Sequence, residues 1–285
     1  MSDKIPPAIL PMELGFEVER ITRGLAAKPD GAWIADYVEF EDAVSNNIKV
    51  SRLHAKDDSM AGLLGKSAGR YSTLQTGPLN EYERLEDICC CLAEELRRYL
   101  APYAGKTLLL CGIGNPDLPY DALGPETVRR VYPKMTMEPY FEKITTFCPG
   151  VSGNTNISTI TAVSGMASAV NAACVLAIDA TDCSDPESIC SCIQLTDAGL
   201  HIRQNGEILD AATIGIPVIA VGMPTSICAS QLGIKIPCDD LLTPAGITNI
   251  IKYAASAIAC AVLQAAYPGM DYETSKMFVD ELMLY

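Results

Sequence analysis

Two apolar runs of strand length, each leading to a carboxylate, constrain the fold more than any other feature of this chain. The first run, residues 108–111, continues through a glycine-containing loop to Asp121. The second, residues 174–178, is followed directly by Asp179. Short apolar runs bounded by turn residues are typical of buried strands. Parallel strands of an open α/β sheet bring their carboxyl ends to one edge, where active sites form. We therefore expect the two aspartates at one rim, where paired carboxylates can share a proton in hydrolysis.

The rest of the chain predicts strands that alternate with helices. Apolar residues recur at helical spacing over 85–100, after a capping-box-like sequence at 80–83, and predict an amphipathic helix. A second helix is expected to open at Gly124, with Pro125 at the first helical position. Further strands are expected over 33–40, 48–53, 175–179, 189–195 and 216–221, and further helices over 156–173, 244–266 and 272–284.

This alternation indicates an α/β fold, in a single domain with a mainly parallel sheet flanked by helices. We place the domain at residues 31–285. Residues 1–30 show little periodicity and several Pro and Gly residues, and we interpret them as an N-terminal extension or a pro-segment.

Charge and hydropathy exclude some classes of function. The chain has 285 residues and a formal net charge of −14, so it lacks the basic field that nucleic-acid binding needs. The acidity suits a neutral or basic protein substrate, or it serves solubility alone. The N-terminus lacks the apolar core of a secretory signal, and the most apolar run, 253–267, is too short to span a bilayer. We expect a cytoplasmic protein without membrane contacts.

The 12 cysteines do not predict a metal site. Without an export signal they should be reduced thiols. Cys89, Cys90 and Cys91 fall in a predicted helix, where neighbouring side chains diverge by about 100°. Cys190 and Cys192 would share one face of a strand, but no C-x-x-C or nearby histidine completes a zinc set. We interpret the cysteines as small buried hydrophobes and expect no metal or other cofactor.

The loop that follows the first apolar run contains Gly112 and Gly114, in a pattern that invites comparison with a dinucleotide-binding loop. Asp117 stands where the third glycine of that motif would be, and its carboxylate would repel a pyrophosphate. The glycines are instead expected to allow a tight turn that carries Asn115 and Asp121 over the sheet edge.

Nucleophilic catalysis has little support, because a serine or cysteine nucleophile needs a base and the chain has only His54 and His201. His201 follows a predicted strand closely enough to approach the rim, or it is a structural hydrogen-bonding group. Asp121 also has a structural alternative, since an aspartate just ahead of a helix can cap its N-terminus.

Several segments together resemble the germination protease family of spore-forming bacteria. The G-x-G-N loop that closes in DALGP at 121–125 is similar to the family's signature, and AIDA at 177–180 matches another of its elements. Further similar segments are GRYSTL at 69–74, CPGVSG at 148–153, LTDAGLH at 195–201 and TIGIPVIAVGMPT at 213–225. These segments follow the family's order, which is more specific than any one motif.

The resemblance implies an endopeptidase that hydrolyses small acid-soluble, DNA-protecting spore proteins in the forespore or spore core. It implies a homotetramer made as a zymogen that trims its own N-terminus. It also implies that Asp121 and Asp179 are the catalytic pair. We expect Asn115 and the backbone N–H groups of the loop to help stabilise an oxyanion. The expected supporting residues are Asn115, Gly112, Gly114, Asp197 and His201.

Two alternatives stay open. The family shares its fold with hydrogenase maturation endopeptidases, which bind nickel through acidic groups and a histidine, so a metal-dependent protease that uses Asp121, Asp179 and His201 is one. The other is a catalytically silent relative with a structural or assembly role. The family's R-T-D-L-A-x-E element is not evident at 12–23, and residues 181–185 add acids after Asp179.

Overall fold

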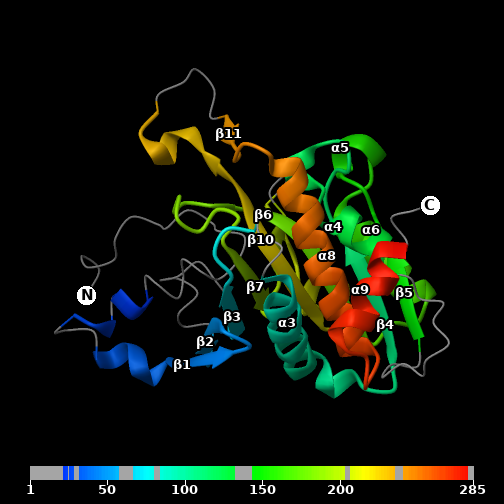
Figure 1. Ribbon diagram of the computed structural model, residues 1–285, viewed down its shortest axis with the longest axis horizontal. Coiled ribbons are helices and arrows are strands. Elements are labelled where there is room, and N and C mark those ends of the chain that lie inside the picture. The colour runs from blue at the N-terminus through cyan, green and yellow to red at the C-terminus, as the bar shows by residue number, and fades with distance from the viewer. Residues whose placement is uncertain are drawn as a thin grey trace.

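The computed structural model describes residues 22–24, 26–28, 32–57, 67–79, 84–131, 143–202, 206–234 and 240–281 (Figure 1). The strands are β1 (Val38–Ser45), β2 (Ile48–Ala55), β3 (Gly69–Gln75), β4 (Thr107–Gly112), β5 (Lys143–Phe147), β6 (Cys174–Cys183), β7 (Cys192–Thr196), β8 (Leu200–Ile202), β9 (Glu207–Leu209), β10 (Val218–Cys228) and β11 (Leu241–Leu242). The α-helices are α3 (Leu85–Leu100), α4 (Leu123–Arg130), α5 (Ser152–Thr155), α6 (Thr159–Ala169), α7 (Ala211–Ile214), α8 (Ile247–Ala266) and α9 (Tyr272–Glu281). The short 3-10 helices are η1 (Ala32–Asp36), η4 (Ala101–Tyr103), η5 (Pro119–Asp121) and η6 (Ala229–Leu232).

The expected α/β class is confirmed, and the sheet is mixed. Across the described residues its strand order is β1-β2-β3-β7-β10-β6-β4-β5, with β11 on β10. The pairs β10–β6, β6–β4 and β4–β5 are parallel, whereas β1, β2, β3 and β7 pair antiparallel with their neighbours. The parallel half contains β4 and β6, the strands that precede Asp121 and carry Asp179. The expected parallel arrangement therefore holds around the candidate site, while the far half of the sheet departs from it.

The antiparallel half follows from local chain geometry. The connection between β1 and β2 consists of Asn46 and Asn47, both with positive φ (47° and 59°). Two residues in this conformation form the tight turn that suits a β-hairpin, and asparagine adopts it more readily than most residues. The chain reverses there instead of crossing over through a helix, so β1 and β2 are antiparallel.

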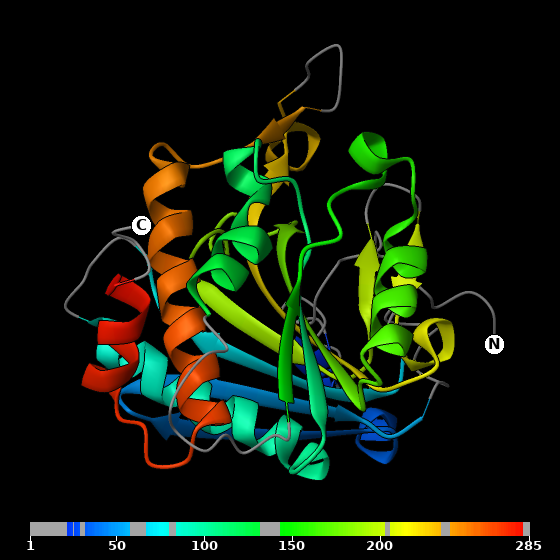
Figure 2. The ribbon, with the colours of Figure 1, turned by 90° about the vertical axis from the view of Figure 1, so that its right-hand side faces the viewer.

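Helices cover both faces of the sheet (Figures 1 and 2). The larger core joins α3, α4 and α8 to sheet residues such as Leu176 and Ile178. The smaller core joins α6 to Val175 and Ala177, the alternate residues of the same strand. Because successive side chains of a strand point to opposite faces, Asp179 belongs to the α6 face.

Two helices show how sequence patterning fixes the larger core. Helix α3 has the predicted bounds and ends in Arg97 and Arg98, which complement the negative end of the helix dipole. Helix α8 satisfies the length and composition criteria for a membrane span, but 67% of its most apolar window is buried inside the molecule. A buried core helix shows the same pattern. Its bounds differ from those of the apolar run at 253–267 because the helix begins at Ile247 and Lys252 interrupts its apolar residues.

Several predicted boundaries are corrected. Helix α4 begins at Leu123, one residue before the expected glycine, so Pro125 is its third residue rather than its first. The helix expected over 156–173 is shorter, and the strands expected over 33–40 and 189–195 begin later, at Val38 and Cys192. Cys190 lies in a turn with φ of 51°, so it does not share a strand face with Cys192. The capping-box-like sequence at 80–83 lies outside the described residues.

Part of the segment predicted as an extension contacts β1. Thr22 is fully buried. The Arg23 guanidinium lies 4.5 Å from the centre of the Phe40 ring and 2.8 Å from Asp42 Oδ1. Residues 1–21 lie outside the described residues, so the extension or pro-segment over 1–30 stays a prediction.

Candidate active site

Asp121 and Asp179 line the same cavity. Asp121 ends η5 in the connection from β4 to α4, and Asp179 lies within β6. The cavity has a volume of about 200 Å³ and opens where β4 ends, beside the part of β6 that continues past its pairing with β4. The structure therefore brings together the two carboxylates that the sequence placed at one rim.

Close backbone contacts hold this rim together. The N–H of Ile113 donates to the carbonyl of Ile178 at 2.8 Å, which joins the chain leaving β4 to the residue just before Asp179. A Cβ on Gly124 would lie 2.3 Å from the Ile113 carbonyl oxygen and 2.4 Å from that of Ile178. Only glycine allows the first turn of α4 to approach the strand ends this closely.

Gly112 makes the matching approach from β4. A Cβ there would lie 2.4 Å from the carbonyl oxygen of Gly124. The glycine pair thus sets the spacing between β4 and α4. This is a close approach of two backbones, whereas the sequence predicted a tight turn at Gly112. Sequence reasoning gave Gly124 no role beyond opening the helix. The packing role follows from a contact with β6 that no local pattern reveals.

The loop from β4 fixes the orientation of Asp121. The N–H of Asn115 donates to Asp121 Oδ2 at 2.8 Å, and the N–H of Asp121 donates to the Leu118 carbonyl at 2.8 Å. Gly114 has φ of +119°, and a Cβ there would lie 2.0 Å from the Asp121 carbonyl oxygen. The loop closes tightly because its second glycine has no side chain.

Asn115 contributes to the site through its backbone. Its N–H is engaged by the Asp121 carboxylate, and its side-chain Oδ1 accepts from the N–H of Asp117 at 3.0 Å. This turn shapes the loop that carries Asp121. Asn115 was expected to help stabilise an oxyanion. In the structure its N–H group positions the Asp121 carboxylate instead.

Asp179 is 7% exposed, and its Oδ1 accepts from the N–H of Ala180 at 2.8 Å. Gly222 is its register partner on β10, so no side chain stands beside it on that strand. On the other side, the pairing with β4 ends with Gly112 opposite Ile178. The space above the carboxylate is consequently open to the cavity.

The cavity walls are mainly apolar. Besides the two aspartates and Thr159, the lining residues are Ile113, Gly114, Leu118, Tyr120, Val151, Ala180 and Ile202. Apolar walls lower the local dielectric and strengthen the interactions of charged groups. Sequence reasoning missed most of these residues. Val151 carries a usable signal, because it follows β5 and lies inside the CPGVSG motif of the resemblance.

Two expected supporting side chains lie elsewhere. Asp197 Oδ2 accepts from Arg70 Nε at 2.7 Å, and its Oδ1 accepts from the Arg70 N–H at 2.6 Å, so it joins the end of β7 to β3. His201 is half-buried in β8, and the next residue, Ile202, lines the cavity. Alternation along the strand turns His201 away from the face that Ile202 presents.

No metal-binding group is found among the described residues. Within that part of the chain, no three His, Cys, Asp or Glu side chains gather as a metal ion requires. Asp121, Asp179 and His201 therefore do not form the three-ligand set of the metal-dependent alternative.

Comparison with known proteins identifies the family. The model of the germination protease family matches residues 26–276, which include both aspartates and every residue of the cavity wall. This chain belongs to the germination protease family. The similar segments noted in the sequence thus reflect membership of that family.

Individual germination proteases are similar at moderate identity. That of Priestia megaterium is 28% identical over 237 residues, which cover 77% of this chain and 64% of the relative. That of Bacillus subtilis is 32% identical over 187 residues, which cover 59% of this chain and 50% of the relative. That of Clostridium tetani is 28% identical over 209 residues, which cover 68% of this chain and 65% of the relative. The chain thus spans about half to two thirds of the length of these relatives.

Proposed function

We propose that this chain is an endopeptidase in which Asp121 and Asp179 form the catalytic pair. The observation that carries the proposal is that both carboxylates line one mainly apolar cavity, where β4 ends and β6 continues past it. Membership of the germination protease family supports a peptidase with this site. The alternative role of Asp121 as a helix cap has no support, because Ala122 is the N-cap of α4 and no side chain caps that helix.

The mechanism follows from two carboxylates that share a proton. Neighbouring carboxylates do not both ionise readily, and the pair titrates as a unit. The ionised one takes a proton from water as the water oxygen bonds to the scissile carbonyl carbon. The protonated one donates a hydrogen bond to the carbonyl oxygen, and a proton passes to the nitrogen as the C–N bond breaks. The N–H groups of Asn115 and Ala180 each fix one carboxylate oxygen, which limits side-chain rotation.

We infer the substrate and the setting from the family resemblance. The substrates are small acid-soluble spore proteins, and the enzyme acts in the forespore or spore core as a homo-oligomer. Some of the first ~25 residues are removed by self-processing, since they lack core periodicity.

The decisive experiment incubates the purified full chain with small acid-soluble spore proteins and identifies fragments by mass spectrometry. The Asp179→Asn variant is treated in parallel, for substrate cleavage and for its own intact mass. We expect defined fragments, and a shortened N-terminus, with the wild type alone. Equal fragments from both would remove Asp179 from the mechanism, and equal intact masses would exclude self-processing.

Chelation separates the aspartate mechanism from the metal-dependent alternative. We expect cleavage to survive EDTA, and His201→Ala to cost far less activity than a change of either aspartate. Activity lost on chelation and restored by nickel or zinc would move the protein to the maturation-protease class. A folded protein that cleaves nothing would favour the catalytically silent reading.

A further inference from the structure

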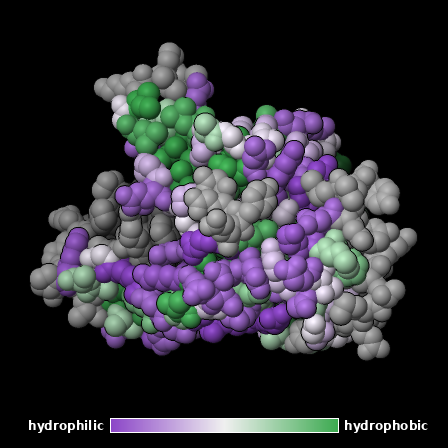
Figure 3. Space-filling view, viewed as in Figure 1, coloured by the Kyte–Doolittle hydropathy of each residue, from purple (hydrophilic) through white to green (hydrophobic). Residues whose placement is uncertain are grey.

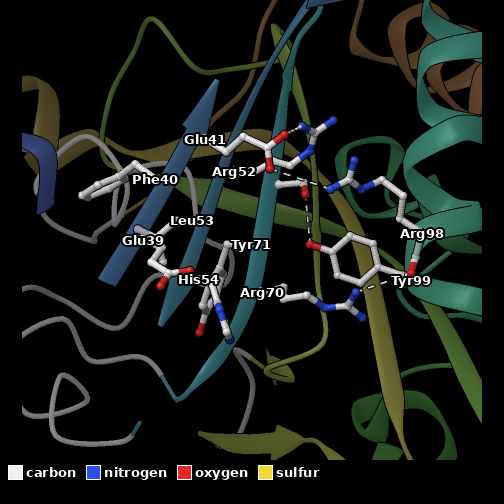
Figure 4. A pocket seen from close by; sticks show the side chains of 11 residues that line it. Glu39, Phe40, Glu41, Arg52, Leu53, His54, Arg70, Tyr71, Arg98 and Tyr99 are labelled. Carbon is white, nitrogen blue, oxygen red and sulfur yellow. Dashed lines mark hydrogen bonds and ion pairs between the residues drawn. The ribbon is translucent and has the colours of Figure 1, made fainter. Parts of the chain in front are cut away.

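A second cavity, of about 260 Å³, lies on the opposite face of the sheet from Asp179 (Figure 4). It is lined by β1, β2, β3 and the carboxyl end of α3. Arg52 continues the alternation of Ile48 and Val50, whose side chains belong to the core beneath α3. The surface over α3 and the first strands is strongly hydrophilic (Figure 3). This cavity is therefore separate from the aspartate site.

Arg52 forms the fixed part of this cavity. Its guanidinium donates to both oxygens of Glu95, at 2.6 and 3.1 Å, and to Glu41 at 2.6 Å. Glu95 is only 2% exposed, and these hydrogen bonds raise the pKa of Arg52 above its ordinary value. Two carboxylates already balance this guanidinium, so Arg52 serves the structure.

Arg98 differs from Arg52 in having no close acceptor. The nearest carboxylate oxygens belong to Glu41, at 3.8 Å, and Glu95, at 4.0 Å. Both separations exceed hydrogen-bond length. Its side chain is 52% exposed and reaches the cavity from the last turn of α3 (Figure 4). Within the described residues, the N–H donors of Arg98 are available to a ligand.

Arg70 is held in place at the opposite side of the cavity. Its Nε donates to Asp197 at 2.7 Å, and its guanidinium lies 4.4 Å from the centre of the Tyr99 ring. Its Nη1 donates to the Arg98 carbonyl at 3.4 Å, while Nη2 has no acceptor in the described part of the chain. The ion pair and the aromatic contact pre-organise a guanidinium with one nitrogen to spare.

A pair of buried hydroxyls lies between these arginines. Tyr99 Oη and Ser72 Oγ are 3.0 Å apart. The two hydroxyl groups carry two protons, and the hydrogen bond between them uses one. The other O–H is left to donate. Burial raises the pKa of Tyr99, and the phenol therefore keeps its proton at neutral pH. The cavity thus offers donors from two guanidinium groups and one hydroxyl.

These donors match a carboxylate or a phosphate, because the guanidinium fork fits the oxygens of both anions. The surrounding charges balance, however, since Glu41, Glu95 and Asp197 offset the three arginines, and Lys56 offsets Glu39. A multiply charged anion gains little in a neutral cavity. A ligand that carries a carboxylate beside an ammonium or amide N–H fits better, because Glu41 can accept from the nitrogen.

We propose that this cavity binds the α-carboxylate end of a peptide or of a free amino acid. Arg98, Arg70 and the spare hydroxyl hold the carboxylate, and Glu41 accepts from the neighbouring nitrogen. The volume is below that of pockets for drug-sized ligands and admits about one or two residues. Peptide hydrolysis creates such carboxylate ends, so the ligand class includes the products of the proposed reaction. That link rests on the proposed function, whereas the binding itself does not.

Calorimetric titration of the full chain tests the proposal without measuring cleavage. The probes are the dipeptide alanyl-leucine, its C-terminal amide, and free leucine. We expect the dipeptide or leucine to bind and the amide not to bind. Binding of leucine alone identifies an amino-acid site, and binding of the dipeptide alone identifies a peptide-end site. Binding of none of the probes, or equal binding of the amide, overturns the proposal.

Matched variants locate the binding. Arg98→Gln should lower the affinity for the probe about tenfold, the loss expected for one charge-assisted hydrogen bond. Arg129→Gln is the control, since Arg129 is 63% exposed and pairs with Glu126 on α4, outside the cavity. Tyr99→Phe combined with Ser72→Ala removes both hydroxyls, keeps the aromatic ring, and should also weaken binding. Unchanged affinity in Arg98→Gln, with circular dichroism showing an intact fold, contradicts the assignment.

Discussion

The backbone N–H of Asn115 lies 2.8 Å from Asp121 Oδ2 and holds this carboxylate against its own loop. The N–H of Ala180 holds Asp179 in the same manner, also at 2.8 Å. An asparagine at either position keeps an oxygen that can accept this bond. Aspartate-to-asparagine changes therefore remove the charge and the shared proton while preserving the local geometry.

We expect Asp121→Asn and Asp179→Asn each to lower peptide cleavage by several orders of magnitude, as measured by steady-state kinetics. The double variant should be little worse than either single one, because the two carboxylates act as a unit. Asp117→Asn is the control, since this exposed residue lies in the same loop but does not line the cavity. Near-normal turnover in one single variant would remove that aspartate from the mechanism.

Gly114→Ala should destabilise the protein by about 1–3 kcal/mol, because its φ of +119° and the 2.0 Å approach to the Asp121 carbonyl leave no room for a Cβ. Urea unfolding measures the change. Gly165→Ala is the matched control. Gly165 is exposed in α6 with open space around it, so alanine there should stabilise by about 0.5–1 kcal/mol. Equal effects of the two changes would contradict the tight loop closure.

Glu126→Gln should cost about 3 kcal/mol in the free energy of unfolding. Arg130 is fully buried, and its Nη1 lies 2.5 Å from Glu126 Oε2. Its Nη2 has no hydrogen-bond partner among the residues that the structure describes, so loss of the carboxylate leaves a buried cation uncompensated. Arg129→Gln removes an exposed pair with the same glutamate and should cost less than about 1 kcal/mol. Chemical denaturation of both variants provides the comparison.

Buried thiols should make the protein less stable at alkaline pH. Burial raises the pKa of Cys91, Cys174 and Cys190 from 9.0 to about 12. The folded state keeps these protons, while the unfolded state releases them. Their stabilisation is complete below pH 9.0 and is lost as pH rises towards 12. The free energy of unfolding should thus fall with pH, by up to about 1.4 kcal/mol per pH unit for each thiol.

Urea unfolding on both sides of pH 9.0 checks this dependence. Cys174→Ala removes one thiol and should reduce the slope of stability against pH, whatever its effect at neutral pH. An unchanged slope in this variant would show that Cys174 does not contribute. The wild type supplies the reference curve, because tyrosines and lysines titrate in the same range in both proteins.

Features set by a short stretch of sequence were predicted well. The bounds of α3 follow from apolar residues at helical spacing, and β4 and the start of β6 follow from uninterrupted apolar runs. The placement of Asp121 and Asp179 follows in turn, since parallel strands end at one edge. Boundaries failed where a turn of helix replaced a strand, as at η1, because hydropathy over a few residues does not separate the two.

The α/β class, the two carboxylates that follow the apolar runs of β4 and β6, and the glycines of the loop between β4 and α4 are readable from the amino-acid sequence alone, although β6 extends four residues past Asp179. They are readable because periodicity and steric freedom are local properties. Only the tertiary structure decided the antiparallel half of the sheet, the engagement of Asp197 by Arg70, the direction of His201 and the cavity beneath α3. Each of these depends on pairing between residues far apart in the chain. Such pairing is selected by the packing of the whole core, so no short window of sequence encodes it.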